Sequence, residues 1–388
     1  MASTSFETEQ NALSFAVHPV TRFAGASKSV RRPREFTCFS YDDNHEFHHD
    51  DSGIRWYYPA EVGADLSAGF KSFIKHDGSE DEHLISLLKA IKGHEEQTGQ
   101  KIDAEFVTWR GMMTKIMAAP FEWRDGFEMN ATLHDGCIFI EENMAYKTAS
   151  QAQSQHQQRR GRIPPEVMTY WGYKFETLST IPGPWGSTPR PIIENRPHER
   201  VNNKAQYCSV VRTGIGASSL CLGGEVDAIW DSKPTTPGAP INWVELKTSK
   251  TLRSERDHEV FNEKLMKFWI QSFLLGVPRI VVGFRSPDGI LEKIEEIETG
   301  RIPQMVQGDR ARWNANICVN FAAAFLDWLK ETVTDEGVWR IARAPGQQEI
   351  TVSRIEAQGY GDILTEEFVN WRIKLLVNQT DGPLPQEA

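Results

Sequence analysis

The sequence lacks the features of a membrane-spanning or disulfide-stabilised protein. It contains no run of about 18 apolar residues and no apolar segment of the kind that a secretion signal carries. Its 5 cysteines are an odd number and form no C-x-x-C pair, which favours a reducing compartment and argues against a zinc ribbon. We therefore expect a chain that has no membrane partner and folds without disulfides.

Positive charge is also scarce. The 43 Lys and Arg residues are outnumbered by 53 Asp and Glu residues, which gives the 388-residue chain a formal net charge of −10. Such an acidic chain is poorly suited to coating duplex nucleic acid with a broad basic face. A local pocket lined by cations, or holding a metal ion, remains compatible with binding the end of a nucleic acid.

No long Pro/Gly/Ser linker divides the chain, and its composition is typical of a globular protein. Residues 1–29 are small and polar and predict a flexible N-terminal arm, whereas residues 30–388 predict a single domain. The basic residues from Lys28 to Arg34 indicate either a solvated loop or a nuclear-import signal. The His-rich tract 45–51 resembles a metal-binding tract, but its polar neighbours favour a surface loop. The Gln-rich stretch 150–162 predicts another exposed loop.

Periodic patterns predict a mixed α+β fold. Apolar residues recur at helical spacing over 80–97, and Asp135-Gly136 between two alternating segments predicts a β-hairpin. A long helix is expected to begin after Ser254, which has an acidic residue three positions on, and to end at Gly276. Further elements are expected as a helix over 313–333 and strands over 105–110, 127–134, 137–141, 224–231, 241–248, 279–284, 338–343 and 349–354.

Two of the predicted strands carry the most informative residues. Glu225 and Asp227 are two positions apart, as are Glu245 and Lys247, so each pair is expected to share one face of its strand. The residues on the opposite faces are apolar. Pairing of the two strands would bring three carboxylates and one ammonium group into a single cleft.

Three carboxylates that lie close together repel one another, and burial would favour their protonation. A divalent cation removes this conflict, and Mg²⁺ or Mn²⁺ prefers carboxylate, carbonyl and water oxygens. Lys247 could then orient a nucleophile or offset charge on a phosphoryl group. An acid followed by E-x-K on the next strand is the spacing of PD-(D/E)xK nucleases. A solvated strand face with cross-strand ion pairs is the alternative that the pattern leaves open.

The next helix has one polar residue, Gln271, in an otherwise apolar segment from Phe268 to Leu275. If it is buried, its amide needs hydrogen-bond partners. Gln271 is therefore either a satisfied core residue or a polar group that faces the cleft.

Several short motifs follow one another along the chain. They are TWRG at 108–111, GYKFE at 172–176, GEVD at 224–227, ELK at 245–247 and the helical segment 264–276. In this order they resemble the motifs of the DXO-type family of RNA 5′-end decapping enzymes and exoribonucleases. That family includes fungal nuclear proteins that activate a nuclear 5′→3′ exoribonuclease.

The resemblance implies a fold and a cofactor. The fold would be α+β, with two mixed β-sheets, surrounding helices and a deep active-site cleft in a PD-(D/E)xK nuclease-like core. Residues 30–388 would then form one catalytic domain. The cofactor would be a divalent metal, Mg²⁺ or Mn²⁺.

The resemblance also implies roles for the residues at the motif positions. Arg110 would grip a phosphate of the RNA 5′ end, and Lys247 and Gln271 would position the attacking water and the scissile phosphate. The implied catalytic residues are Lys247, Gln271, Glu225 and Asp227; those that bind substrate are Arg110, Glu176, Lys247 and Gln271; those that hold metal are Glu176, Glu225, Asp227, Glu245 and, through its backbone carbonyl, Leu246.

The function implied is metal-dependent hydrolysis at RNA 5′ ends, which would remove triphosphates, incomplete caps or NAD caps and leave a 5′-monophosphate. The expected location is the nucleus. An alternative of a different class is a mainly non-catalytic subunit that stabilises and activates a nuclear 5′→3′ exoribonuclease. A DNA endonuclease of the PD-(D/E)xK type is a third possibility.

Overall fold

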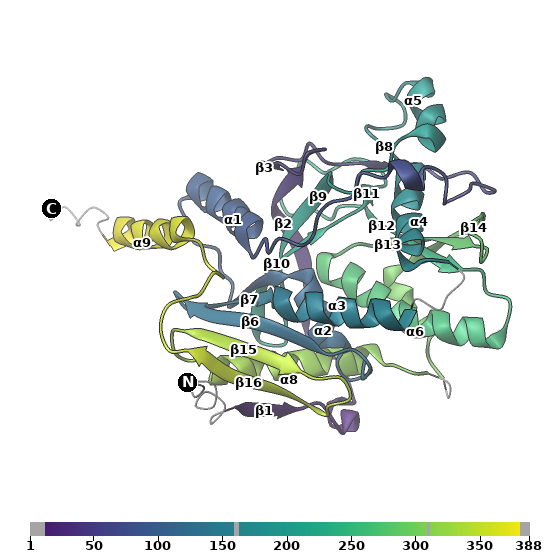
Figure 1. Cartoon of the computed structure of the whole chain (residues 1–388). Coiled ribbons are helices and arrows are strands. Elements are labelled where there is room, and N and C mark those ends of the chain that lie inside the picture. The colour runs from purple at the N-terminus through teal and green to yellow at the C-terminus, as the bar shows by residue number, and fades with distance from the viewer. Residues whose placement is uncertain (1–11, 159–162, 309–310, 381–388) are drawn as a thin grey trace, which may run out of the picture.

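Two mixed β-sheets form the framework of the protein (Figure 1), whose computed structural model describes residues 12–158, 163–308 and 311–380. The larger sheet has 10 strands, in the order β1 (Leu13–Ala16), β16 (Glu349–Glu356), β15 (Val338–Arg343), β6 (Phe127–His134), β7 (Cys137–Glu142), β5 (Phe106–Trp109), β10 (Ser218–Glu225), β9 (Gln206–Ile215), β2 (Val30–Tyr41) and β3 (Phe47–His48). The smaller sheet has 6 strands, in the order β14 (Leu291–Glu298), β13 (Arg279–Arg285), β12 (Trp243–Lys250), β11 (Ala228–Ile229), β4 (Trp56–Tyr57) and β8 (Thr180–Ile181).

Helices surround both sheets (Figure 1). They are α1 (Ile85–Thr98), α2 (Arg110–Ala118), α3 (Met144–Gln158), α4 (Pro165–Leu178), α5 (Arg190–Asn195), α6 (Glu255–Leu275), α7 (Ile302–Met305), α8 (Ala315–Thr332) and α9 (Glu366–Thr380).

The largest hydrophobic core lies where α2 packs against α6 and α8 and against the larger sheet. Its apolar side chains include Met113 and Ile116 of α2, Leu274 of α6 and Phe321 and Phe325 of α8, all of them buried. Because α2 begins directly after β5, this packing fixes the first residue of α2 at the end of a central strand. That position is where the candidate site is built.

Local signals in the sequence predicted several elements correctly. The hairpin of β6 and β7 turns at Asp135 and Gly136, whose φ angles of 49° and 71° are both positive, as a two-residue hairpin turn requires. Helix α6 begins after Ser254, whose hydroxyl accepts a hydrogen bond from the Asp257 N–H at 3.2 Å. It ends at Gly276, which has a φ of 73°.

The expectation of a loosely held arm is wrong for the described residues 12–29. Strand β1 pairs with β16 in an antiparallel register that places Phe15 opposite Ile350. Phe15 and Phe23 are buried against the aromatic rings of α8. The alternation is too short to signal a strand by itself, and it is the apolar surface of α8 that holds the segment. Residues 1–11 lie outside the described part of the chain.

Two other expected loops are regular structure. The basic residues from Arg31 to Arg34 begin β2, which pairs with β9, so they do not form a solvated loop. The Gln-rich stretch continues α3 as far as Gln158, and 159–162 lie outside the described residues. Glutamine is a good helix former, so a polar composition alone was a poor guide to a loop.

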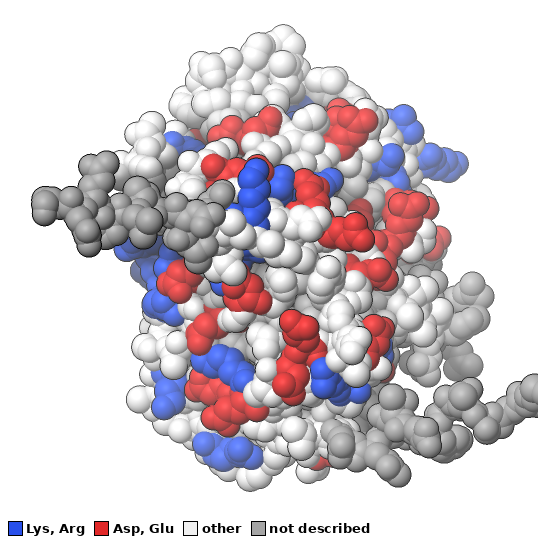
Figure 2. Space-filling model, turned by 90° about the vertical axis from the view of Figure 1, so that its left-hand side faces the viewer, with Lys and Arg blue, Asp and Glu red and all other residues white. Residues whose placement is uncertain are grey.

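The surface charge and the apolar character of the helices bear on binding to nucleic acids and to membranes. Among the described residues on the face shown in Figure 2, acidic and basic side chains are interspersed and form no broad basic area. None of the helices in the described ranges has both the length and the apolar character needed to span a bilayer.

Candidate active site

The chain passes from the larger sheet to the smaller one at the acidic motif. Strand β10 ends at Glu225 and β11 begins at Ala228, so the expected single strand over 224–231 is wrong. The reason is a change of partners: the Val226 N–H bonds to the Tyr207 carbonyl, whereas the Ile229 N–H bonds to the Arg55 carbonyl. Glu225 is therefore the last residue of β10 in the larger sheet, and Asp227 lies in the short connection to the smaller sheet.

Strand β12 meets this crossing point. Its Val244 pairs with Ala228, and the Leu246 N–H donates a hydrogen bond to Asp227 Oδ2 at 2.6 Å. On the same strand Glu245 is 1% exposed and accepts a hydrogen bond from Lys247 Nζ at 2.6 Å. The strand pairing predicted from the sequence is correct, and it places Asp227 beside the E-x-K residues.

Arg110 reaches the same point from the larger sheet. It is the first residue of α2, directly after β5, which runs parallel to β10 with Trp109 opposite Gly223. Its Nη1 lies 3.2 Å from Glu245 Oε2. Glu245 is thus a buried carboxylate held by two cations, one from each side.

A glycine makes this approach possible. A Cβ atom at Gly224 would lie 3.0 Å from Cβ of Arg110 and 2.9 Å from a methyl group of Leu275. Any larger residue would displace Arg110 or α6. The glycine in the GEVD motif therefore lets α2 and α6 pack against the end of β10.

Glu176 comes from α4, which packs on β12 through Phe175 and Trp171 and the apolar face that contains Val244 and Leu246. It lines a cavity of about 410 Å³ together with the acidic motif. The residues that line it include Arg55, Tyr173, Glu176, Arg200, Asn202, Asn203, Tyr207, Glu225 and Asp227. The cavity agrees with the expected cleft.

The carboxylates in and beside this cavity affect one another's pKa. Burial, followed by repulsion from Asp227 and Glu225, raises the pKa of Glu176 well above its usual range. Burial and the Glu245 charge raise the pKa of Asp227 to about 8, and burial also raises the pKa of Glu225. Burial acts in the same direction on Glu245, but Lys247 and Arg110 outweigh it and lower its pKa to about 2.

These shifts describe a set of acidic groups that resists losing all its protons without an added positive charge. Four carboxylates, from α4, the crossing point and β12, offer the oxygen ligands that Mg²⁺ and Mn²⁺ prefer. The donor set therefore fits a divalent cation. Glu176, Glu225, Asp227 and Glu245 would hold it, and the carbonyl of Leu246 on the same strand is the expected fifth ligand.

Gln271 occupies the helix face that turns toward this site. Phe268, one turn before it on α6, has its ring 6.0 Å from Lys247 Nζ, and Leu275, one turn after it, packs at Gly224. Gln271 is half-buried and lines a separate cavity of about 250 Å³ beside Lys267. Gln271 is therefore not a fully buried core residue, and the cavity that it lines is not the one that holds Glu225 and Asp227.

Sequence reasoning missed three polar residues that line the larger cavity. Arg55 precedes β4, and Arg200 and Asn202 lie in the irregular segment before β9. They contribute two guanidinium groups and an amide to the cavity. No local pattern marks them, because their position depends on tertiary contacts such as that of Arg55 with Glu199 at 3.4 Å.

Comparison with known proteins identifies the family of this chain. The model of the family described as RAI1 like PD-(D/E)XK nuclease matches residues 31–369. The chain belongs to this family. Its sequence is 63% identical over 370 residues to the decapping nuclease RAI1 of Gibberella zeae, covering 95% of this chain and 98% of that relative.

Solved structures of the family resemble the whole fold. Candida albicans Rai1 in complex with pU5-Mn²⁺ superimposes with a TM-score of 0.87 at 31% identity, covering 94% of this chain and 100% of that one. Scheffersomyces stipitis Rai1 in complex with (3′-NADP)⁺ and calcium ion gives a TM-score of 0.82 at 29% identity over 90% and 98% of the two chains. The family and the fold class that the motifs predicted are both confirmed.

Proposed function

We propose that this protein is a metal-dependent decapping nuclease that hydrolyses phosphate bonds at RNA 5′ ends and leaves a 5′-monophosphate. The observation that carries the proposal is the convergence of four carboxylates with Lys247 and Arg110 between the two sheets. A mainly non-catalytic subunit would have no need for such a set, because buried like charges destabilise a fold. The alternative of a purely activating subunit is therefore not favoured.

Each residue of the cluster would have its own role in hydrolysis. A bound Mg²⁺ or Mn²⁺ would polarise a phosphoryl oxygen and lower the pKa of a water molecule. Glu176, Glu225 and Asp227 line the cavity and would orient that ion toward substrate. Glu245 holds the ammonium group of Lys247 within hydrogen-bond distance, so that this cation is pre-positioned to stabilise charge that develops on the phosphoryl group.

Arg110 and Gln271 would act on the substrate from α2 and α6. Within the described part of the chain, the Arg110 guanidinium bonds Glu245 through Nη1, which leaves other N–H donors of the fork for a substrate phosphate. Gln271 offers both an amide donor and an acceptor, which suits the positioning of a water molecule. Arg55 and Arg200, which line the larger cavity, would add positive charge where an RNA 5′ end enters.

We further propose that triphosphates, incomplete caps and NAD caps are substrates and that the enzyme works in the nucleus. The complexes of related Rai1 proteins with pU5-Mn²⁺ and (3′-NADP)⁺ support a site that accepts nucleotide and dinucleotide groups. A nuclear 5′→3′ exoribonuclease is the partner that the family resemblance suggests. Fluorescent tagging at the native locus tests the location, and co-purification tests the partner.

The test of the central proposal is product identification. RNAs with triphosphate, NAD, unmethylated and methylated caps are incubated with the protein and either Mg²⁺ or Mn²⁺, and duplex DNA is included as a separate substrate. We expect 5′-monophosphate RNA from at least one non-canonical end and no cleavage after metal removal. Cleavage of duplex DNA with all RNA ends left intact would instead support the endonuclease alternative.

A further inference from the structure

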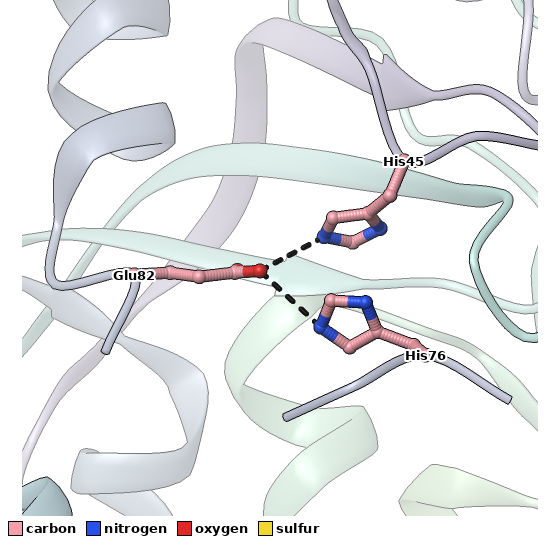
Figure 3. Close-up of side chains that lie close together, drawn as sticks. All are labelled: His45, His76 and Glu82. Carbon is pink, nitrogen blue, oxygen red and sulfur yellow. Dashed lines mark hydrogen bonds and ion pairs between the residues drawn. The ribbon is translucent and has the colours of Figure 1, made fainter. Parts of the chain in front are cut away.

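A second cluster of metal-ligating side chains lies at the rim of the cavity. Figure 3 shows His45, His76 and Glu82 converging, with the Nε2 atoms of both rings directed at one carboxylate oxygen. Glu82 Oε1 lies 3.0 Å from His45 Nε2 and 3.2 Å from His76 Nε2. His45 belongs to the turn between β2 and β3, whereas His76 and Glu82 come from the segment that precedes α1. Two segments of the chain thus meet at one point.

The hydrogen bond on the far side of His45 determines what its ring presents to Glu82. His45 Nδ1 lies 2.8 Å from the carbonyl oxygen of Lys204. Because a carbonyl oxygen only accepts, Nδ1 carries the proton, and Nε2 of the neutral ring directs a lone pair at the carboxylate. Nε2 and the carboxylate oxygen, 3.0 Å apart, could thus both bind one cation.

Aromatic packing holds the rings of His45 and His76 close together. The His45 ring lies between Tyr41, at 3.9 Å, and His76, at 4.0 Å. Both rings present Nε2 to the same carboxylate oxygen, as two ligands of a single divalent ion would.

The turn that carries His45 is built in advance. His45 has a φ of 72°, an uncommon angle for a residue other than glycine. Asp42 supports the turn, because its Oδ1 accepts hydrogen bonds from the backbone N–H groups of Asn44 and Glu46 at 2.8 and 2.9 Å. The Tyr41 hydroxyl bonds to Ser86 at 2.6 Å, which fixes the ring on which His45 stacks. The position of the imidazole is therefore set by its surroundings.

We propose that His45 Nε2, His76 Nε2 and the Glu82 carboxylate bind a zinc-class transition-metal ion, with water completing a tetrahedral site. Nitrogen and oxygen ligands about 2.0–2.1 Å from Zn²⁺ lie about 3.3 Å apart at the tetrahedral angle, close to the two separations found here. Two imidazoles suit Zn²⁺ better than Mg²⁺, which prefers oxygen. The bond from Nδ1 to a backbone carbonyl is the support that metal-binding histidines commonly have.

Such an ion would fasten the rim of the catalytic cavity. Lys204, which supports His45, is joined in sequence to Asn203, whose side-chain oxygen accepts a hydrogen bond from the His76 backbone N–H at 2.7 Å. Asn203 itself lines the cavity that holds the acidic motif. The site would tie three segments together and position that wall, while the carboxylate cluster performs the chemistry.

The experiment separates this site from the carboxylate cluster by working in the untagged full-length Glu225→Gln/Asp227→Asn protein. After chelation and dialysis against Zn²⁺, we expect it to retain about one Zn²⁺ by mass spectrometry and Co²⁺ to give the strong visible absorption of a tetrahedral complex. His45→Gln, His76→Gln and Glu82→Gln, each added to this protein, should lose the bound ion. His258→Gln, on the exposed first turns of α6, is the matched control and should retain it.

Thermal unfolding checks that each variant is folded and whether it still binds Zn²⁺. Zn²⁺ should raise the Tm of the parent and of the His258→Gln variant by at least about 2 °C and leave the Tm of the other three unchanged. Because Glu82 is 48% exposed, its replacement should fold even if a histidine variant does not. The proposal would be overturned if the parent retained no Zn²⁺. It would also be overturned if the Glu82→Gln and His76→Gln proteins retained as much Zn²⁺ as the parent. Loss only on replacing His48, in the adjacent group with Asp42 and Glu46, would overturn it as well.

Discussion

Two strands of the smaller sheet carry the same pairing of an acid and a lysine two residues apart, and only one of them builds a site. Glu245 and Lys247 lie on β12, and Lys293 and Glu295 lie on β14, with β13 between the two strands. Both pairs are in contact on one face of their strand. The Glu245 side chain is 1% exposed, whereas the Glu295 side chain is 40% exposed.

The difference lies in what each pair meets. Residues of β14 pair with cations that are partly or largely exposed, such as Arg253 with Glu292 at 2.8 Å and Arg279 with Glu296 at 2.7 Å. Such exposed pairs are screened by solvent and contribute little. Glu245 instead meets Arg110 and lies beside other buried carboxylates. Spacing along one strand therefore does not define the site, and the convergence of several elements does.

The strongest test of this contrast removes one carboxylate from the buried cluster and, separately, one from β14. Asp227→Asn or Glu225→Gln should lower hydrolysis of 5′-triphosphate RNA by about 10³-fold or more, because the metal ion loses a ligand. Glu295→Gln on β14 should leave the rate unchanged. Single-turnover assays with Mn²⁺ measure the difference, and circular dichroism checks that each variant is folded. Near wild-type hydrolysis by Asp227→Asn would contradict the proposed metal site.

The two lysines give a second comparison. Lys247→Met should lower the single-turnover rate by about 10²-fold, since a pre-positioned cation is lost from the phosphoryl group, and should leave metal binding in place. Lys293→Met should change neither the rate nor metal binding. Calorimetric titration with Mn²⁺ distinguishes a defect in chemistry from a defect in metal binding. A Lys247→Met protein that no longer bound the ion would show that this lysine is structural.

The sequence predicted the site better than it predicted the surrounding fold. Glu245, Lys247 and Asp227 were placed together because strand periodicity and a family pattern acted on short segments. The expected strand over 224–231 failed because periodicity does not report a change of sheet, which depends on the hydrogen bonds of Val226 and Ile229. The acidic residues of the site were therefore predicted, whereas the change of sheet and the cavity residues Arg55, Arg200 and Asn202 were not.

The elements that were not predicted depend on distant partners. Helix α9 packs against α1, and its Arg372 forms a buried ion pair with Glu95 at 2.8 Å. Strand β1 needs β16 and the apolar face of α8. Neither segment has strong local periodicity, and both are stabilised by contacts between residues far apart in the chain, as the 277 positions that separate Glu95 from Arg372 illustrate. A single sequence does not display such contacts.

The raised pKa of Asp227 predicts that the stability of the metal-free protein depends on pH. The residues of β14 should not contribute to this dependence. The folded-state pKa of Asp227 is about 8 against an ordinary value of 3.8, so between these pH values the folded metal-free protein binds more protons than the unfolded chain. Its stability must therefore fall as the pH rises through this window. We expect metal-free wild type to lose on the order of 2 kcal/mol more than Glu225→Gln/Asp227→Asn between about pH 5 and pH 9.

Urea unfolding at several pH values measures this loss, and Glu295→Gln serves as the matched variant, which should follow wild type. Saturating Mn²⁺ should abolish the excess loss, because the ion competes with the protons for the same oxygens. An excess loss that persisted in the double variant would place its origin outside the cluster.

The smallest expected effect concerns how closely the helices approach β10. Gly224→Ala would force Arg110 or Leu275 to move, since the added Cβ would lie 3.0 and 2.9 Å from their nearest atoms. The cost in unfolding free energy should be about 1–2 kcal/mol. Gly172, in the middle of α4, is the matched glycine, because a methyl group added there would meet no neighbouring side chain within 4 Å. Its change to Ala should be neutral or slightly stabilising.

The same two variants show what the close packing at Gly224 does for the substrate. If Gly224→Ala weakens the binding of 5′-phosphorylated RNA while Gly172→Ala does not, that packing serves to hold Arg110 in place. The reason is that the added Cβ of Gly224→Ala would press on Cβ of Arg110 and shift the guanidinium group that faces Glu245. Equal binding by the two variants would mean that Arg110 keeps its position without that packing.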